Sequence, residues 1–84
     1  MDQRKRIVYV LRSDRDTGRY YTGLTSDLAR RLEAHNAGRV PHTANGKSWI
    51  IDVVVEFAEE RRAIAFEKYL KSGSGCAFAM RHLR

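Results

Sequence analysis

Two short runs of β-branched and aromatic residues near the start of the chain constrain its fold more than any other feature. Strand composition is found in residues 6–13 (RIVYVLRS) and again in residues 19–23 (RYYTG), with turn residues 14–18 (DRDTG) between them. We therefore expect an antiparallel β-hairpin. Because side chains alternate between the two faces of a strand, Tyr21 would share the face of Tyr9 if the hairpin register permits.

The rest of the chain alternates between helical patterns and one strongly apolar run. Hydroxyl and acidic residues at positions 25–27 suit a helix start, and Gly38 suits a helix end. The run WIIDVVVEF is the most hydrophobic stretch and predicts a central strand. In order, we expect a helix over residues 25–37, an ordered polar loop over 38–48, this strand over 49–57, a helix over 59–70, a break over 72–75 and a short last helix over 77–83. The chain is thus predicted to form one α+β domain over residues 1–84, in the order ββαβαα.

The charge of the chain points to its partner. The formal net charge is +6, and most of the basic residues are Arg, whose guanidinium group grips phosphates in a bidentate fork. Nucleic acid is therefore the expected partner, and a soluble domain that is simply basic is the alternative. The apolar runs are shorter than a membrane span and the N-terminus does not resemble a signal peptide, so we expect no membrane partner and a cytoplasmic location. Cys76 is the only cysteine, which excludes an intrachain disulfide and a cysteine-rich zinc site.

Two polar residues of the first predicted helix lie close to its apolar stripe. Leu28 and Leu32 define that stripe, and the helical period puts Arg31 and His35 on it or beside it. Burial of an unpaired charge is costly, so Arg31 either extends its aliphatic stem to water or has a functional partner. His35 stands near the helix end, where it either helps to cap the helix or takes part in chemistry.

The second predicted helix has the same feature. Ala63, Phe66 and Leu70 mark its apolar stripe, and Glu67 lies on the same side. A buried Glu needs a partner, which would be Arg31, a neighbouring Lys or a metal ion. A Glu opposite an Arg, with tyrosines on the sheet between them, is also the outline of a phosphate-hydrolysis site, although each tyrosine alone would more often be a core residue.

Together these motifs resemble those of the GIY-YIG endonuclease family in order and spacing. The first triplet lacks its Gly but keeps its Tyr, and residues 66–73 (FEKYLKSG) look like the end of the small stand-alone members. The matching motifs are Ile7-Val8-Tyr9, Tyr21-Thr22-Gly23, Leu28-x-x-Arg31-x-x-x-His35 and Glu67. The resemblance covers nearly the whole chain.

The resemblance implies a small three-stranded antiparallel sheet flanked by helices. It also implies a metal-dependent endonuclease that hydrolyses phosphodiester bonds in nucleic acid, with DNA expected as the substrate and a structure-selective role in repair or recombination. The implied catalytic residues are Tyr9, Tyr21, Arg31, His35 and Glu67. Either tyrosine would activate the attacking water, and Gly23 would allow close packing behind Tyr21.

Phosphodiester hydrolysis also requires a positive charge that neutralises the negative phosphoryl oxygens. Glu67 is the one carboxylate at a plausible site position, so a single Mg²⁺ or Mn²⁺ ion held by it, by water and by the phosphate fits better than a two-metal site. Basic residues expected near the site, and hence on the nucleic acid, are Arg19, Arg30, Arg39, Lys47 and Lys71.

Two other functions remain open at this point. One is a non-catalytic nucleic-acid-binding module that retains the fold, and the other is a basic domain for a different anionic partner. We expect weak sequence preference unless a partner protein supplies specificity.

Overall fold

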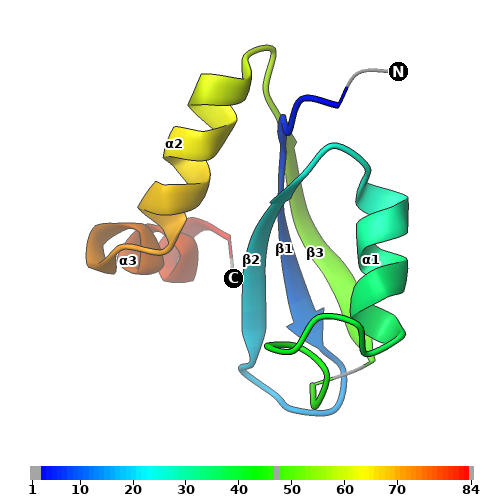
Figure 1. Ribbon diagram of the computed structural model, residues 1–84. Coiled ribbons are helices and arrows are strands. Elements are labelled where there is room, and N and C mark those ends of the chain that lie inside the picture. The colour runs from blue at the N-terminus through cyan, green and yellow to red at the C-terminus, as the bar shows by residue number, and fades with distance from the viewer. Residues whose placement is uncertain (1–2, 47, 84) are drawn as a thin grey trace.

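A computed structural model describes residues 3–46 and 48–83 of the chain. At its centre is a three-stranded antiparallel sheet with the strand order β2-β1-β3 (Figure 1). The elements are β1 (Ile7–Ser13), β2 (Tyr20–Thr25), α1 (Leu28–Asn36), β3 (Trp49–Glu56), α2 (Glu60–Leu70) and α3 (Gly73–His82). The predicted α+β class and the order ββαβαα are confirmed. No helix of the described ranges is long and apolar enough to cross a membrane.

The apolar run that was expected to be the central strand is instead the edge strand β3. The central strand is β1, which pairs with both neighbours, so that Leu11 lies between Tyr21 of β2 and Ile51 of β3. Ile51 and Val54 of β3 are 37% and 44% exposed, whereas Leu11 is fully buried. Apolar composition was misleading because β-branched residues suit any half-buried strand, whereas the central position depends on pairing with distant segments.

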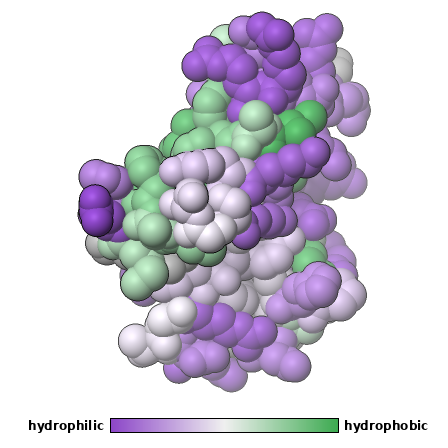
Figure 2. Space-filling model, turned by 90° about the vertical axis from the view of Figure 1, so that its left-hand side faces the viewer, coloured by the Kyte–Doolittle hydropathy of each residue, from purple (hydrophilic) through white to green (hydrophobic). Residues whose placement is uncertain are grey.

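The two faces of the sheet are covered by different helices. Figure 1 shows α1 on one side of the sheet and α2 and α3 on the other. Val8 and Val10 of β1 pack toward α2 and α3, whereas Tyr9 and Leu11 belong to a second cluster with Trp49. Figure 2 views the molecule from the side of α2 and α3, where hydrophobic residues form a band between hydrophilic ones. The alternation of side chains along β1 thus separates two cores.

Helix α1 begins and ends close to its predicted positions. Its N-cap is Asp27, whose carboxylate accepts a hydrogen bond from the backbone N–H of Arg30 at 3.1 Å, so the cap is an acid and not a hydroxyl. At the other end Gly38 has a φ of 76°, which suits a glycine. The backbone N–H of Arg39 then reaches back to the carbonyl of Ala34 at 3.0 Å, as in a Schellman turn.

Helix α3 starts earlier than its sequence suggested. Ser72 is its N-cap, and the Ser72 hydroxyl accepts a hydrogen bond from the N–H of Gly75 at 3.1 Å. A Cβ atom at Gly75 would overlap the backbone carbonyl of Tyr69, so glycine here permits close approach of α3 to the end of α2. The predicted break over residues 72–75 is therefore mostly the first turn of a helix.

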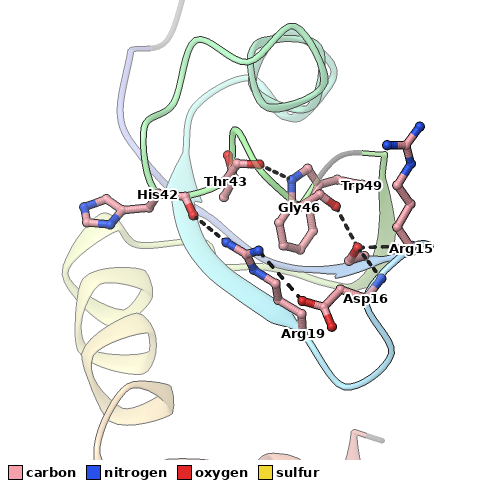
Figure 3. A network of polar contacts seen from close by, with 8 residues as sticks. Arg15, Asp16, Arg19, His42, Thr43, Gly46 and Trp49 are labelled. Atoms are coloured by element: carbon pink, nitrogen blue, oxygen red, sulfur yellow. Dashed lines mark hydrogen bonds and ion pairs between the residues drawn. The ribbon is translucent and has the colours of Figure 1, made fainter.

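The described part of the polar segment between α1 and β3, residues 37–46 and 48, is an ordered loop, as predicted. It folds against the end of the hairpin, where the indole N–H of Trp49 donates to the carbonyl of Thr43 at 2.8 Å (Figure 3). From the hairpin side, the guanidinium of Arg19 donates to the carbonyl of His42 at 3.3 Å. These bonds join the loop to both the hairpin and the start of β3.

Candidate active site

Tyr9 and Tyr21 lie side by side on the face of the sheet that α1 covers. In the register of β1 and β2, Leu11 is opposite Tyr21 and Tyr9 is opposite Gly23, which places both rings on one face with centroids 6.3 Å apart. A Cβ atom at Gly23 would overlap the hydroxyl of Tyr9. The expectation that Gly23 makes room behind Tyr21 is therefore wrong, because the crowded ring belongs to its cross-strand partner.

Arg31 reaches both tyrosines from α1. Its Nε donates to the hydroxyl of Tyr9 at 3.3 Å, and Tyr21 lies near enough to contribute to the raised pKa of Arg31. Arg31 is only partly buried, so its charge faces both the phenols and the solvent. Its position beside the apolar stripe is explained by these partners and not by an aliphatic stem that leads to water.

His35 is fully buried and is hydrogen-bonded through both ring nitrogens. Its Nε2 lies 2.9 Å from the Tyr9 hydroxyl, and its Nδ1 lies 2.7 Å from Oγ1 of Thr43. Its ring also lies 4.8 Å, centroid to centroid, from that of Tyr21. The side chain of His35 thus belongs to the tyrosine cluster and does not cap the helix end.

Burial controls the protonation of this cluster. It raises the pKa of Tyr9 above its usual value of 10.0, and the hydrogen bond from Arg31 only partly opposes this change. The negative charge of Glu67 acts on Tyr9 in the same direction as burial. Burial, with a smaller contribution from the Arg31 cation, lowers the pKa of His35 to about 4. At neutral pH Tyr9 therefore keeps its proton and His35 is uncharged.

Glu67 lies on α2 and faces a lysine. Its carboxylate is 2.6 Å from Nζ of Lys71, and the two side chains are 16% and 51% exposed. Of the ion pairs considered for Glu67, the one with a neighbouring Lys is present, whereas Arg31 is hydrogen-bonded to Tyr9. The structure thus joins Tyr9, Arg31 and His35 in direct contact, while Glu67 acts on Tyr9 through its charge.

The Glu67 carboxylate has the chemistry that a Mg²⁺ ion requires. Mg²⁺ takes oxygen ligands and is commonly held by one or two carboxylates together with water and substrate phosphate. Over residues 3–46 and 48–83, no three His, Cys, Asp or Glu side chains gather into a metal cluster, so Glu67 would be a lone protein ligand. Because Lys71 is half exposed, its ammonium group can leave Glu67 for solvent at little cost.

One predicted nucleic-acid-binding residue is bonded within the protein. The Arg19 guanidinium lies 3.8 Å from the carboxylate of Asp16 and 5.8 Å from the ring centre of Trp49 (Figure 3). With its bond to the loop carbonyl of His42, Arg19 has three partners that order the end of the hairpin. The structure therefore provides a structural role for Arg19 beside the predicted one.

The other predicted contacts with nucleic acid differ in their exposure and pairing. Arg30 and Arg39 are exposed, Lys71 is paired with Glu67, and Lys47 lies outside the described residues. Next to Arg31 is an open pocket of about 230 Å³ at the start of α1. It is lined by Thr25, Ser26, Asp27, Arg30, Arg31 and Ala34. Two guanidinium groups at a helix N-terminus suit an anion such as a phosphate group.

The sequence did not point to Thr43, which completes the cluster. Thr43 is fully buried, although it lies in a polar loop where an exposed threonine would be ordinary. Its partner His35 lies eight residues earlier in the chain, near the end of α1. No local sequence pattern reveals this contact. The only available signal was that the loop was expected to be ordered.

The fold and this cluster define the class of protein. The family model described as the GIY-YIG catalytic domain matches residues 5–76. A UPF0213 protein of Bacillus cereus (strain ZK / E33L) is 32% identical over 72 residues, which cover 84% of this chain and 73% of that protein. A UPF0213 protein of Orgyia pseudotsugata multicapsid polyhedrosis virus is 33% identical over 79 residues, 92% of this chain and 74% of that protein. No solved structure matches the chain.

This class is a family of nucleases. The chain belongs to the GIY-YIG family, as the resemblance of its motifs implied.

Proposed function

We propose that this protein is a metal-dependent endonuclease that hydrolyses phosphodiester bonds in DNA. The observation that carries the proposal is the Tyr9 hydroxyl, which contacts both Arg31 and His35 next to an open, guanidinium-lined pocket. We further propose that the substrate is a branched DNA of repair or recombination and that the protein acts in the cytoplasm. The net charge of +6 supports a polyanionic substrate.

Arg31 has the central position in the proposed reaction. In the free protein Arg31 is hydrogen-bonded to the hydroxyl of Tyr9, and Tyr9 is only 1% exposed to solvent. A phosphate in the neighbouring pocket would draw the guanidinium toward itself and neutralise charge on the phosphoryl oxygens. The same movement would uncover Tyr9 to the attacking water. Tyr21, which is less buried, would orient that water.

The proton would then pass along the buried hydrogen bonds. The water gives a proton to the Tyr9 oxygen, the Tyr9 proton moves to Nε2 of His35, and the hydroxide forms the new bond to phosphorus. The bond from phosphorus to the leaving oxygen breaks, and that oxygen takes a proton from solvent. A divalent ion on Glu67 would supply positive charge that stabilises the developing phosphoryl charge. His35 later releases its proton, and its pKa of about 4 makes this release easy.

The first experiment changes Glu67 to Gln. We expect cleavage of branched DNA in Mg²⁺ to be abolished, and a chelator to have the same effect on the wild type. The melting temperature should hardly change, because a half-exposed ion pair contributes at most about 1 kcal/mol. The control is Glu56→Gln, which removes an exposed carboxylate on β3. A folded and fully active Glu67→Gln protein would overturn the metal-dependent proposal.

One observation favours a second candidate, a binding module without catalysis. Lys71 already satisfies the Glu67 carboxylate at 2.6 Å, so the structure is stable there without a metal ion. This candidate predicts that the wild type binds branched and linear DNA equally in Mg²⁺ and in chelator, and cleaves neither.

A further inference from the structure

We propose that Thr43 is a positioning residue for the reaction, because it holds His35 in the tautomer that presents an unprotonated Nε2 to Tyr9. This inference rests on the proposed function and extends it to a loop residue outside the family motifs. It is based on four hydrogen bonds that lead from α1 to Tyr9 of the sheet, back to α1 and on to the loop.

The direction of each bond follows from which groups can donate. The Nε–H of Arg31 can only donate, so the Tyr9 oxygen accepts at that 3.3 Å contact. At the other end, the Thr43 hydroxyl donates its one proton to the carbonyl of Val40 at 3.3 Å. With that proton directed to Val40, the Thr43 oxygen accepts at the 2.7 Å contact, and we assign the proton of the neutral imidazole to Nδ1 of His35. The Tyr9 hydroxyl therefore donates to the free Nε2 at 2.9 Å.

Thr43 can fix this tautomer because its own position is fixed. Its backbone carbonyl accepts the indole N–H of Trp49 at 2.8 Å and the backbone N–H of Gly46 at 3.1 Å. Gly46 itself lies so close to the Trp49 ring that an added Cβ would overlap it. Figure 3 shows Thr43 beside these two residues. The buried indole thus anchors the turn that carries the hydroxyl.

The alternative tautomer would obstruct the proton path. With its proton on Nε2, His35 would turn a donor toward the Tyr9 hydroxyl, and that hydroxyl would lose its acceptor. The other groups around the imidazole cannot correct this, because Arg31 only donates and Tyr21 presents its ring to the imidazole. Thr43 is thus the contact that sets the proton of His35 on Nδ1, and Tyr9 then donates to Nε2.

The test measures the tautomer directly, in the free protein and without DNA or metal. ¹⁵N NMR of the imidazole nitrogens distinguishes protonation at Nδ1 from protonation at Nε2. We expect the wild type and Thr43→Ser to carry the His35 proton on Nδ1, and Thr43→Val, which keeps the shape but lacks the hydroxyl, to lose this preference. The exposed His42 and His82 are internal references that should not change.

The kinetic arm uses the same variants. We expect Thr43→Val to lower kcat about tenfold, the size of one buried hydrogen bond, with KM unchanged and with rescue in Thr43→Ser. A wild type that is protonated on Nε2 would overturn the inference, whether or not the Val variant folds. A Val variant that keeps Nδ1 protonated would also overturn it. A wild type with the expected tautomer but no cleavage would instead overturn the proposed function.

Discussion

The two faces of the central strand have different tasks. Toward α2 and α3, β1 presents Val8 and Val10 to a cluster made only of hydrophobic residues. Toward α1 it presents Tyr9, which lies among hydrogen-bonded polar groups such as His35. Side chains alternate between the two faces of this one strand. Packing on the apolar face therefore holds the backbone rigid, and this backbone positions the side chains of the polar face. Substitutions on the two faces should therefore affect different measurements.

Among substitutions on the polar face of the sheet, the largest expected effect is that of Tyr9→Phe on cleavage. The change removes the proposed proton carrier and should lower the rate by about 10²–10⁴-fold. It also removes the hydroxyl that His35 and Arg31 share, which should cost about 1–3 kcal/mol of stability. The measurements are single-turnover cleavage and urea unfolding, with Tyr69→Phe, an exposed tyrosine of α2, as control. Undiminished cleavage in a folded Tyr9→Phe protein would show that the polar face of the sheet does not carry out the reaction.

Leu70→Ala should have the opposite profile. Leu70 is 5% exposed in the cluster beneath α2, and truncation of such a leucine costs about 2–5 kcal/mol. Urea unfolding should show this loss, while the cleavage rate per folded molecule stays unchanged at low temperature. Met80→Ala, on a side chain that is 67% exposed, should change stability by less than about 0.5 kcal/mol. Equal losses in both variants would mean that the apolar face is not the main support of the fold.

Because it contains His35, the polar face should also make the stability of the protein depend on pH. Unfolded His35 binds a proton near its usual pKa of 6.5, whereas the buried side chain binds one only near pH 4. Between these values the unfolded chain holds more protons, so acid favours unfolding. The stability is fully present above pH 6.5, and roughly 3 kcal/mol of it should be lost as the pH falls toward 4.

Urea unfolding at stepped pH measures this loss. A His35→Asn variant should start from a lower stability but lose less of it across the same pH range. His82→Gln, on an exposed histidine, should behave as the wild type. Identical pH profiles for the wild type and His35→Asn would show that His35 is not the titrating group.

The smallest expected effect is that of Cys76→Ser. Cys76 is exposed on α3, and its Sγ has a weak contact with the carbonyl of Leu70 at 3.6 Å. Since α3 covers the apolar side of the sheet, we expect binding, cleavage and stability to remain within error of the wild type. A loss of cleavage with the fold intact would reveal chemistry on α3, a helix to which we assign none.

Local patterns were enough to predict much of this structure. The alternation of side chains placed Tyr9 and Tyr21 on one face, and the helical period drew attention to Arg31 and His35, because these signals depend only on neighbours in sequence. The roles of the catalytic residues stay predictions, since geometry brings groups together without showing a reaction.

What the sequence could not predict depends on partners far along the chain. The central position of β1 follows from pairing with β3, and the crowding at Gly23 follows from the ring of its cross-strand partner Tyr9. Thr43 meets His35 only after the loop has folded over the hairpin.

The strand order also has a consequence for the time course of folding. The central strand meets β2 after a tight turn, but it meets β3 only after α1 and a long loop have been placed between them. Short loops close faster than long ones, so we expect the hairpin to assemble first and β3 to dock late. During that interval the open side of β1 would offer unpaired N–H and C=O groups to any other chain nearby. The protein would then be most prone to aggregate while it is being made, before its last strand arrives.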